Sequence, residues 1–268
     1  MLVTRVGSGS FTRAASTNIS ASLTSTDPFT LETIGKGTVL NNSTGVAGGG
    51  QHFSDGSLVT GSKDNLRFEI SGINKTAGTF NLSIRRGDDN LNNKIVLETF
   101  VGCSLDPKAE NYISKIVGDQ YASTDTYEGQ TVLRVNGDYP NKSKFVFIKT
   151  VGLPTPDYLL NDGTIGVDSS GAIYSASLPI AQSGSFHGAT GTNIPGAASS
   201  TGMFTFENIN STNTQGLVAS DYTTALNILK NKDEYRFATL TLPGVYQKDY
   251  AAAVAEAIEL CEGRGDCF

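Results

Sequence analysis

Several short stretches of the chain alternate between apolar and polar residues. The alternation is clearest in residues 66–70 and 79–86, which are joined by a short linker containing Gly78. A period of two places every second side chain on the same face of a β-strand, so the two stretches are predicted to pair as a hairpin. Further strands are predicted at residues 2–6, 29–34, 95–100, 131–135 and 144–150.

A short helix is predicted between these strands, in residues 106–117. Asp106 is of a type that caps helix N-termini, Pro107 suits the first helical position, and Gly118 stops the apolar pattern. Residues 154–216 are rich in Gly, Ser, Asn and Pro with only scattered apolar residues. They are predicted to form an outward-facing excursion.

The pattern changes in the last fifty or so residues. An amphipathic helix is predicted at residues 221–230, a strand at 239–244 and an Ala-rich helix at 249–261, which Gly263 ends. Residues 266–268 are predicted to begin another strand, so the order of elements is that of a strand–helix–strand unit whose second strand is incomplete. Because this return strand only begins, the apolar helix face and the strand edge are expected to stay uncovered.

Composition narrows the classes of function. Charged residues make up 17% of the 268 residues, against roughly 25% in an average globular protein, and 30 glycines accompany them. This mixture is typical of a β-rich protein with many turns. The net charge of −6 and the lack of a Lys/Arg cluster argue against a nucleic-acid partner. Glu256 and Glu259 interrupt the most apolar C-terminal stretch, so membrane insertion is not expected.

The residues capable of metal or thiol chemistry are few. Cys103, Cys261 and Cys267 form an odd set, which argues against a secreted disulfide framework. They are predicted to be reduced thiols, and cross-linking to a neighbouring subunit stays open as the alternative. With only His52 and His187 beside them, no zinc site is expected.

Other candidate motifs for ligand binding or catalysis do not have the residue spacing that these functions require. Residues 35–38 lack the spacing of a phosphate loop, and neither histidine has a nucleophile motif beside it. Residues 87–93 carry oxygen ligands of the kind that calcium binds but lack the EF-hand glutamate, so a solvated turn is favoured. The adhesion-like tripeptide at residues 264–266 is interpreted as a chance match at a helix end. We therefore expect a protein that is not an enzyme, and assign no catalytic, metal or cofactor residue.

A series of motifs in residues 78–120 carries a family resemblance. In order, they are GTFNLSIRR (78–86), VLETF (96–100), SLDP (104–107), NYI (111–113) and IVGD (116–119). As a set they resemble the middle region of contractile tail sheath proteins of tailed bacteriophages. LVTRV (2–6) is similar to a sheath strand, and LPG (242–244), the Ala-rich helix and RGDCF (264–268) are similar to the α/β module of the family.

The resemblance implies a role in packing. Sheath subunits stack around a tail tube in an extended helical lattice that stores free energy, and contraction drives the tube through the target envelope. Expected partners are copies of the same chain and the tail tube, baseplate and tail terminator proteins. The expected location is the virion, after synthesis in the host cytoplasm. The family's N-terminal and C-terminal portions are expected to be missing here.

The predicted fold class is α+β, with a β-rich middle and outer region and an incomplete α/β module shared between the first strand and the C-terminal segment. Residues 1–12 are assigned to the inner module, 13–118 to the β-rich middle region, 119–215 to a variable outward-facing region and 216–268 to the truncated α/β module. Three alternatives remain: a β-rich surface adhesin, the sheath of a related contractile injection system, and a hydrolase with carboxylate chemistry.

Overall fold

The computed structural model describes residues 12–22, 25–37, 52–59, 61–190 and 219–268. The described chain divides into two compact units: the β unit, within residues 12–121 and 136–190, and the C-terminal unit, within residues 122–135 and 219–268. The structure is 35% strand and 15% helix. These contents confirm the α+β class with a dominant β portion. The predicted strand at residues 2–6, on which the shared α/β module depends, lies outside the described residues.

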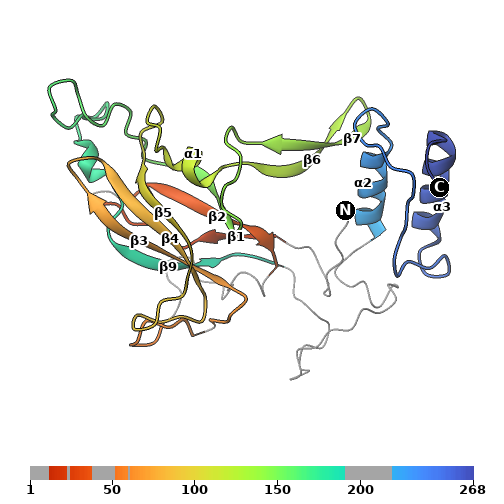
Figure 1. Cartoon of the computed structure of the whole chain (residues 1–268), viewed down its shortest axis with the longest axis horizontal. Helices are drawn as coiled ribbons and strands as arrows, with labels where there is room; N and C mark the ends of the chain where they lie inside the picture. Colours follow the sequence, from red (N-terminus) through yellow and green to blue (C-terminus); the bar gives the residue numbers. More distant parts are fainter. Residues whose placement is uncertain (1–11, 23–24, 38–51, 60, 191–218) are drawn as a thin grey trace. The chain divides into compact units, whose positions relative to one another are not determined.

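The β unit is built on one curled antiparallel sheet of seven strands (Figure 1). The strands are β1 (Arg13–Ser16), β2 (Phe29–Lys36), β3 (Leu66–Asn74), β4 (Thr79–Arg86), β5 (Val96–Ser104), β8 (Val146–Val151) and β9 (Gln182–His187). They are hydrogen-bonded in the order β5-β4-β3-β9-β1-β2-β8, so β5 and β8 are the edge strands. A short 3₁₀ helix, η1 (Tyr174–Ala176), precedes β9.

β3 and β4 form the predicted hairpin. Their register runs from Leu66 opposite Arg86 to Asn74 opposite Thr79. Gly78 lies in the turn with φ of 69°, a left-handed conformation that glycine adopts without the steric cost of a Cβ atom. The strands predicted at residues 29–34, 95–100 and 144–150 also form, as β2, β5 and β8, with ends shifted by a few residues.

The apolar face of the sheet encloses one continuous core. Phe29 and Phe80 stack with ring centroids 5.5 Å apart, and Phe68 meets Phe186 edge to face at 6.0 Å. All four rings are fully buried, and burying such a side chain contributes about 1.5–3 kcal/mol. The other buried members include Ile19, Leu31, Ile70, Leu82, Ile84, Ile113, Val117 and Leu178.

β9 is a strand that the sequence pattern did not predict. It lies between β3 and β1 in the sheet, with Phe68 opposite Gly184 and Ala15 opposite His187. A Cβ atom at residue 184 would overlap the ring of Phe68 and the hydroxyl of Thr17. The strand therefore carries a glycine where its neighbours supply the bulk, and this glycine is one departure from the usual β pattern.

The helix predicted at residues 106–117 is wrong at its N-terminus. The structure has only α1 (Ile113–Val117), which begins after Tyr112 without a side-chain cap. Asp106 Oδ1 instead accepts a hydrogen bond from the Lys108 N–H at 2.9 Å, so this aspartate closes a local turn, as Asx side chains often do. The turn is held to β5 by a hydrogen bond from Asn111 Nδ2 to the carbonyl of Gly102 at 2.6 Å.

The C-terminal unit contains a hairpin and two helices. The hairpin consists of β6 (Tyr121–Tyr127) and β7 (Gln130–Asn136), of which only β7 was predicted. The helices, α2 (Ala219–Leu229) and α3 (Ala251–Arg264), correspond to the two predicted helices and lie side by side (Figure 1). The strand predicted at residues 239–244 does not form: this segment is irregular and turns at Pro243 and Gly244.

Candidate functional site

Neither histidine belongs to a group of side chains that could bind a metal ion among the described residues. His52 is exposed and bridged to Leu58, and His187 ends β9. Among the described residues, no group of three or more His, Cys, Asp or Glu side chains is placed to hold a metal ion. Gly35 and Lys36 belong to a strand. Two features with organised side chains are a buried ionic cluster in the β unit and an apolar groove in the C-terminal unit.

The ionic cluster is centred on Asp89, in the loop that had suggested a solvated turn. Asp89 is 2% exposed and accepts hydrogen bonds from Arg85 Nε at 2.6 Å, Arg85 Nη2 at 2.8 Å and Arg67 Nη1 at 3.0 Å. For Asp89, the solvated-turn prediction is therefore wrong, since two arginines surround its carboxylate where water or calcium was considered. Asp88, which is partly exposed, pairs with Arg86 at 2.6 Å.

The reason for this cluster is the register of the hairpin. Arg67 and Arg85 lie directly opposite each other on β3 and β4, and like charges in that position destabilise a sheet. Burial, followed by the charge of Arg85, lowers the pKa of the Arg67 guanidinium. Asp89 and Glu69, which is 2.7 Å from Arg85 Nη1, compensate the two charges. The facing arginines were the sequence signal that could have indicated a buried carboxylate.

The groove is built on α3. Its Ala-rich sequence favours a helix, which ends at Gly265 in the left-handed conformation with φ of 69°, two residues beyond the predicted stop at Gly263. The Gly265 N–H donates to the carbonyl of Cys261 at 2.9 Å. One side of α3 packs against α2 through Ala257, Leu260 and Leu226, which are buried.

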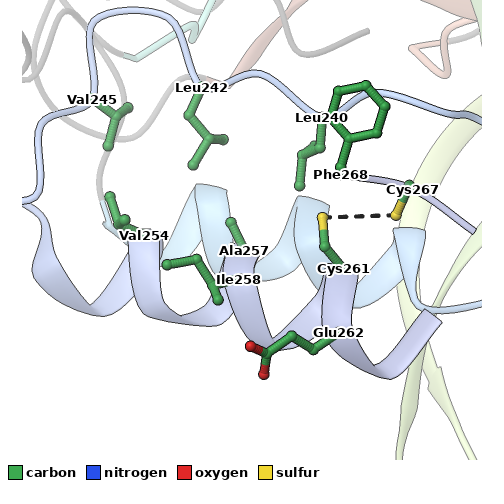
Figure 2. A pocket seen from close by; sticks show the side chains of 10 residues that line it. All are labelled: Leu240, Leu242, Val245, Val254, Ala257, Ile258, Cys261, Glu262, Cys267 and Phe268. Carbon is green, nitrogen blue, oxygen red and sulfur yellow. Dashed lines mark hydrogen bonds between the residues drawn. The ribbon is translucent and has the colours of Figure 1, made fainter. Parts of the chain in front are cut away.

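The groove runs between α3 and the chain segments beside it (Figure 2). It has a volume of about 550 Å³, and its walls are apolar apart from Glu262 and the two cysteine thiols. Ile258 is 54% exposed and Phe268 is 81% exposed. The other lining residues are Leu240, Leu242, Val245, Val254, Ala257, Cys261 and Cys267.

One wall of the groove carries the beginning of a parallel strand pair. The Leu240 N–H donates to the carbonyl of Phe268 at 2.9 Å, and the Phe268 N–H donates to the carbonyl of Ala238 at 3.1 Å. Two bonds from one residue to partners two positions apart are the pattern of a parallel ladder. The predicted strand–helix–strand unit is therefore reduced to this single link in the described chain.

Arg264 fastens the end of α3 to the rest of the unit. Its guanidinium donates to the carbonyls of Leu229 at 2.5 Å and Tyr235 at 2.8 Å, and lies over the ring of Phe237 at 4.5 Å. It also forms a forked pair with Asp266, which lowers the pKa of that carboxyl. Because Arg264 is buried, the tripeptide at residues 264–266 has a structural use at this helix end.

A second apolar surface lies in the β unit, along the edge strand β5. Val96 is 50% exposed, Leu97 37% and Val101 70%. Edge strands with exposed apolar side chains are ready to associate with other chains, because their backbone groups lack a strand on one side. β5 is also the strand that contains the sheath-like VLETF sequence.

No family model, no curated protein and no solved structure matches this chain. No helix in the described part of the chain is long and apolar enough to cross a membrane.

Proposed function

We propose that this protein is a structural subunit of the contractile sheath around a phage tail tube. In this role, copies of the chain associate in an extended helical lattice, contact the tube, and release stored free energy when the lattice contracts. The sheath of a related contractile injection system is the same proposal for a different particle.

The observation that carries the proposal is the open apolar groove of the C-terminal unit. Exposed apolar surfaces in a folded protein commonly mark sites of association, and this groove lies beside a backbone segment that already makes parallel-ladder bonds. Its walls offer apolar side chains and backbone groups, which suit the burial of a further protein segment. A groove of this kind would allow a structural subunit to bind a neighbouring protein chain.

The edge strand β5 supports the proposal independently. Val96 and Val101 expose apolar surface in the β unit, so each unit has a surface suited to association. A subunit in a contracting lattice needs rigid bodies whose contacts can be exchanged. The continuous core and the Asp89 cluster are features of such a rigid body.

The choice of a sheath among possible assemblies rests on the motifs in residues 78–120. These residues form β4, β5, the turn closed by Asp106 and α1, which is a continuous part of the β unit. Buried motif residues such as Phe80, Leu105 and Ile113 contribute to its core. Part of the motif set therefore contributes to the packing of the β unit.

Electron microscopy of particles that contain the protein tests the proposal. Particles are purified from the producing host, labelled with gold-conjugated antibodies to this chain and imaged. Label distributed along the tail, on a layer of stacked rings around a tube, is the expected result. Label confined to a fibre tip or particle surface, with no helical layer, would overturn the sheath proposal and favour the adhesin.

A further inference from the structure

We propose that Cys261 and Cys267 form a reversible dithiol site, which an oxidant of the disulfide class converts into an intramolecular disulfide. The inference goes beyond the sheath proposal and does not depend on it. It concerns a covalent link between the last turn of α3 and the segment that follows Gly265.

The geometry of the helix end brings the two thiols together. Cys267 Sγ donates a hydrogen bond to Cys261 Sγ at 3.7 Å (Figure 2). The left-handed Gly265 turns the chain back, so that a residue six positions later returns to the helix. A sulfur–sulfur bond measures about 2 Å, so the sulfur atoms have to approach by roughly 2 Å or less.

The surrounding contacts keep this arrangement in place. The Arg264–Asp266 fork, with distances of 2.9 and 2.8 Å, spans the turn between the two cysteines. The backbone bonds of Phe268 to Ala238 and Leu240 hold the residue next to Cys267. The thiols are therefore positioned by contacts on both sides of Gly265.

The two thiols are accessible, unlike the third. Cys261 and Cys267 are partly exposed and line the open groove, whereas Cys103 is fully buried in the core of the β unit. Burial raises the pKa of Cys103 to about 12, so only a small fraction of this thiol is ionised and able to react. Cys103 is thus an internal control in the same chain.

Oxidised glutathione serves as the oxidant in this reaction. Each disulfide formed in the protein yields two molecules of reduced glutathione. The thiolate of one cysteine attacks oxidised glutathione, forms a mixed disulfide and releases one glutathione thiolate. The second cysteine then attacks the protein sulfur of the mixed disulfide and releases the other. The protein loses two electrons and two protons, which leave with the two glutathione molecules, and gains one sulfur–sulfur bond.

The disulfide would fix one wall of the groove. It would join α3 to the residue beside Phe268, whose backbone bonds hold the segment at Leu240. Burial and the hydrogen bond from Cys267 raise the pKa of Cys261. Because the thiolate is the reactive form, oxidation through Cys261 is expected to quicken as the pH rises above neutrality.

Peptide mapping tests the site directly, because Arg264 lies between the two cysteines. The folded protein is incubated with oxidised glutathione, quenched in acid, denatured, alkylated and digested with trypsin without reduction. Cleavage after Arg264 separates the cysteines, so their peptides stay together only if a disulfide joins them. We expect a linked peptide in monomeric protein, a fall from three free thiols to one, and reversal by dithiothreitol.

The control variant is Cys267→Ser, in which the linked peptide should disappear while Cys103 and the fold are unaffected, as checked by circular dichroism. Three free thiols after incubation, glutathione adducts without a linked peptide, or disulfides only between separate chains would each overturn the proposal.

Discussion

The two units of this protein use apolar residues in different ways. In the β unit, aromatic and aliphatic side chains from many strands close into one continuous core. In the C-terminal unit, buried residues form two small clusters, and apolar side chains, among them the exposed Ile258 and Phe268, line an open groove. The difference indicates that the β unit buries most of its apolar side chains in its own core, whereas the C-terminal unit exposes part of its apolar surface in the groove.

Replacing a phenylalanine in each unit should give the largest difference in the free energy of unfolding. Phe80→Ala removes a buried ring that stacks on Phe29, and should lower the free energy of unfolding by about 3–5 kcal/mol. Phe268→Ala removes an exposed ring of the groove and should change it by about 0.5 kcal/mol or less. Urea denaturation followed by circular dichroism measures both. Equal losses would contradict the comparison.

The ionic cluster gives a second contrast, within the β unit. Asp89→Asn removes the carboxylate that lies between Arg67 and Arg85, and should cost about 3–5 kcal/mol because buried charges lose their partner. Asp88→Asn is the matched control: its pair with Arg86 is partly exposed and should be worth less than about 1 kcal/mol. If both variants unfold at the same urea concentration, the cluster does not stabilise the β unit.

Lysine substitutions on α3 test whether the groove is an association surface. Ile258→Lys places a charge in the groove, while Ala255→Lys adds the same charge to an exposed position on the same helix outside it. We expect Ile258→Lys to reduce self-association at least tenfold in sedimentation-velocity experiments and Ala255→Lys to leave it nearly unchanged. Association that survives both variants would remove the groove from the interface.

The smallest expected effect concerns Tyr222, a buried residue of α2 whose hydroxyl has no hydrogen-bond partner among the described residues. Burial, then Tyr250 and Asp221, raises the pKa of Tyr222 to about 12. The folded state therefore holds this proton more tightly than the unfolded state, whose tyrosines ionise near pH 10. The resulting stabilisation is complete below about pH 10 and is lost as the pH rises towards 12.

Tyr222→Phe should therefore be neutral or slightly stabilising at pH 7, because it removes an unsatisfied buried group. It should also lose less stability than the parent protein between pH 10 and 12. Thermal unfolding followed at both ends of this range measures the difference. An identical pH dependence in the two proteins would show that Tyr222 has no part in it.

Structural features that depend on residues close together in the chain could be predicted from the sequence. The alternation in residues 66–86 and the turn glycine at 78 correctly indicated the β3–β4 hairpin, and alanine-rich periodicity indicated α3. Asp106 shows the limit of such reasoning. Its side chain suits a helix cap and an Asx turn equally, and the bonds from Asn111 to Gly102 and from Ser104 to Asn111 accompany the turn.

The sequence by itself determined the β-rich class, the hairpin and the positions of the long helices, because strand alternation and helix periodicity are properties of contiguous residues. Only the tertiary structure decided that Gly184 lies under Phe68 in the middle of the sheet, that Asp89 separates two facing arginines, and that Cys261 approaches Cys267. Each of these depends on partners supplied by another strand, a loop or a chain reversal, and on the register in which they meet.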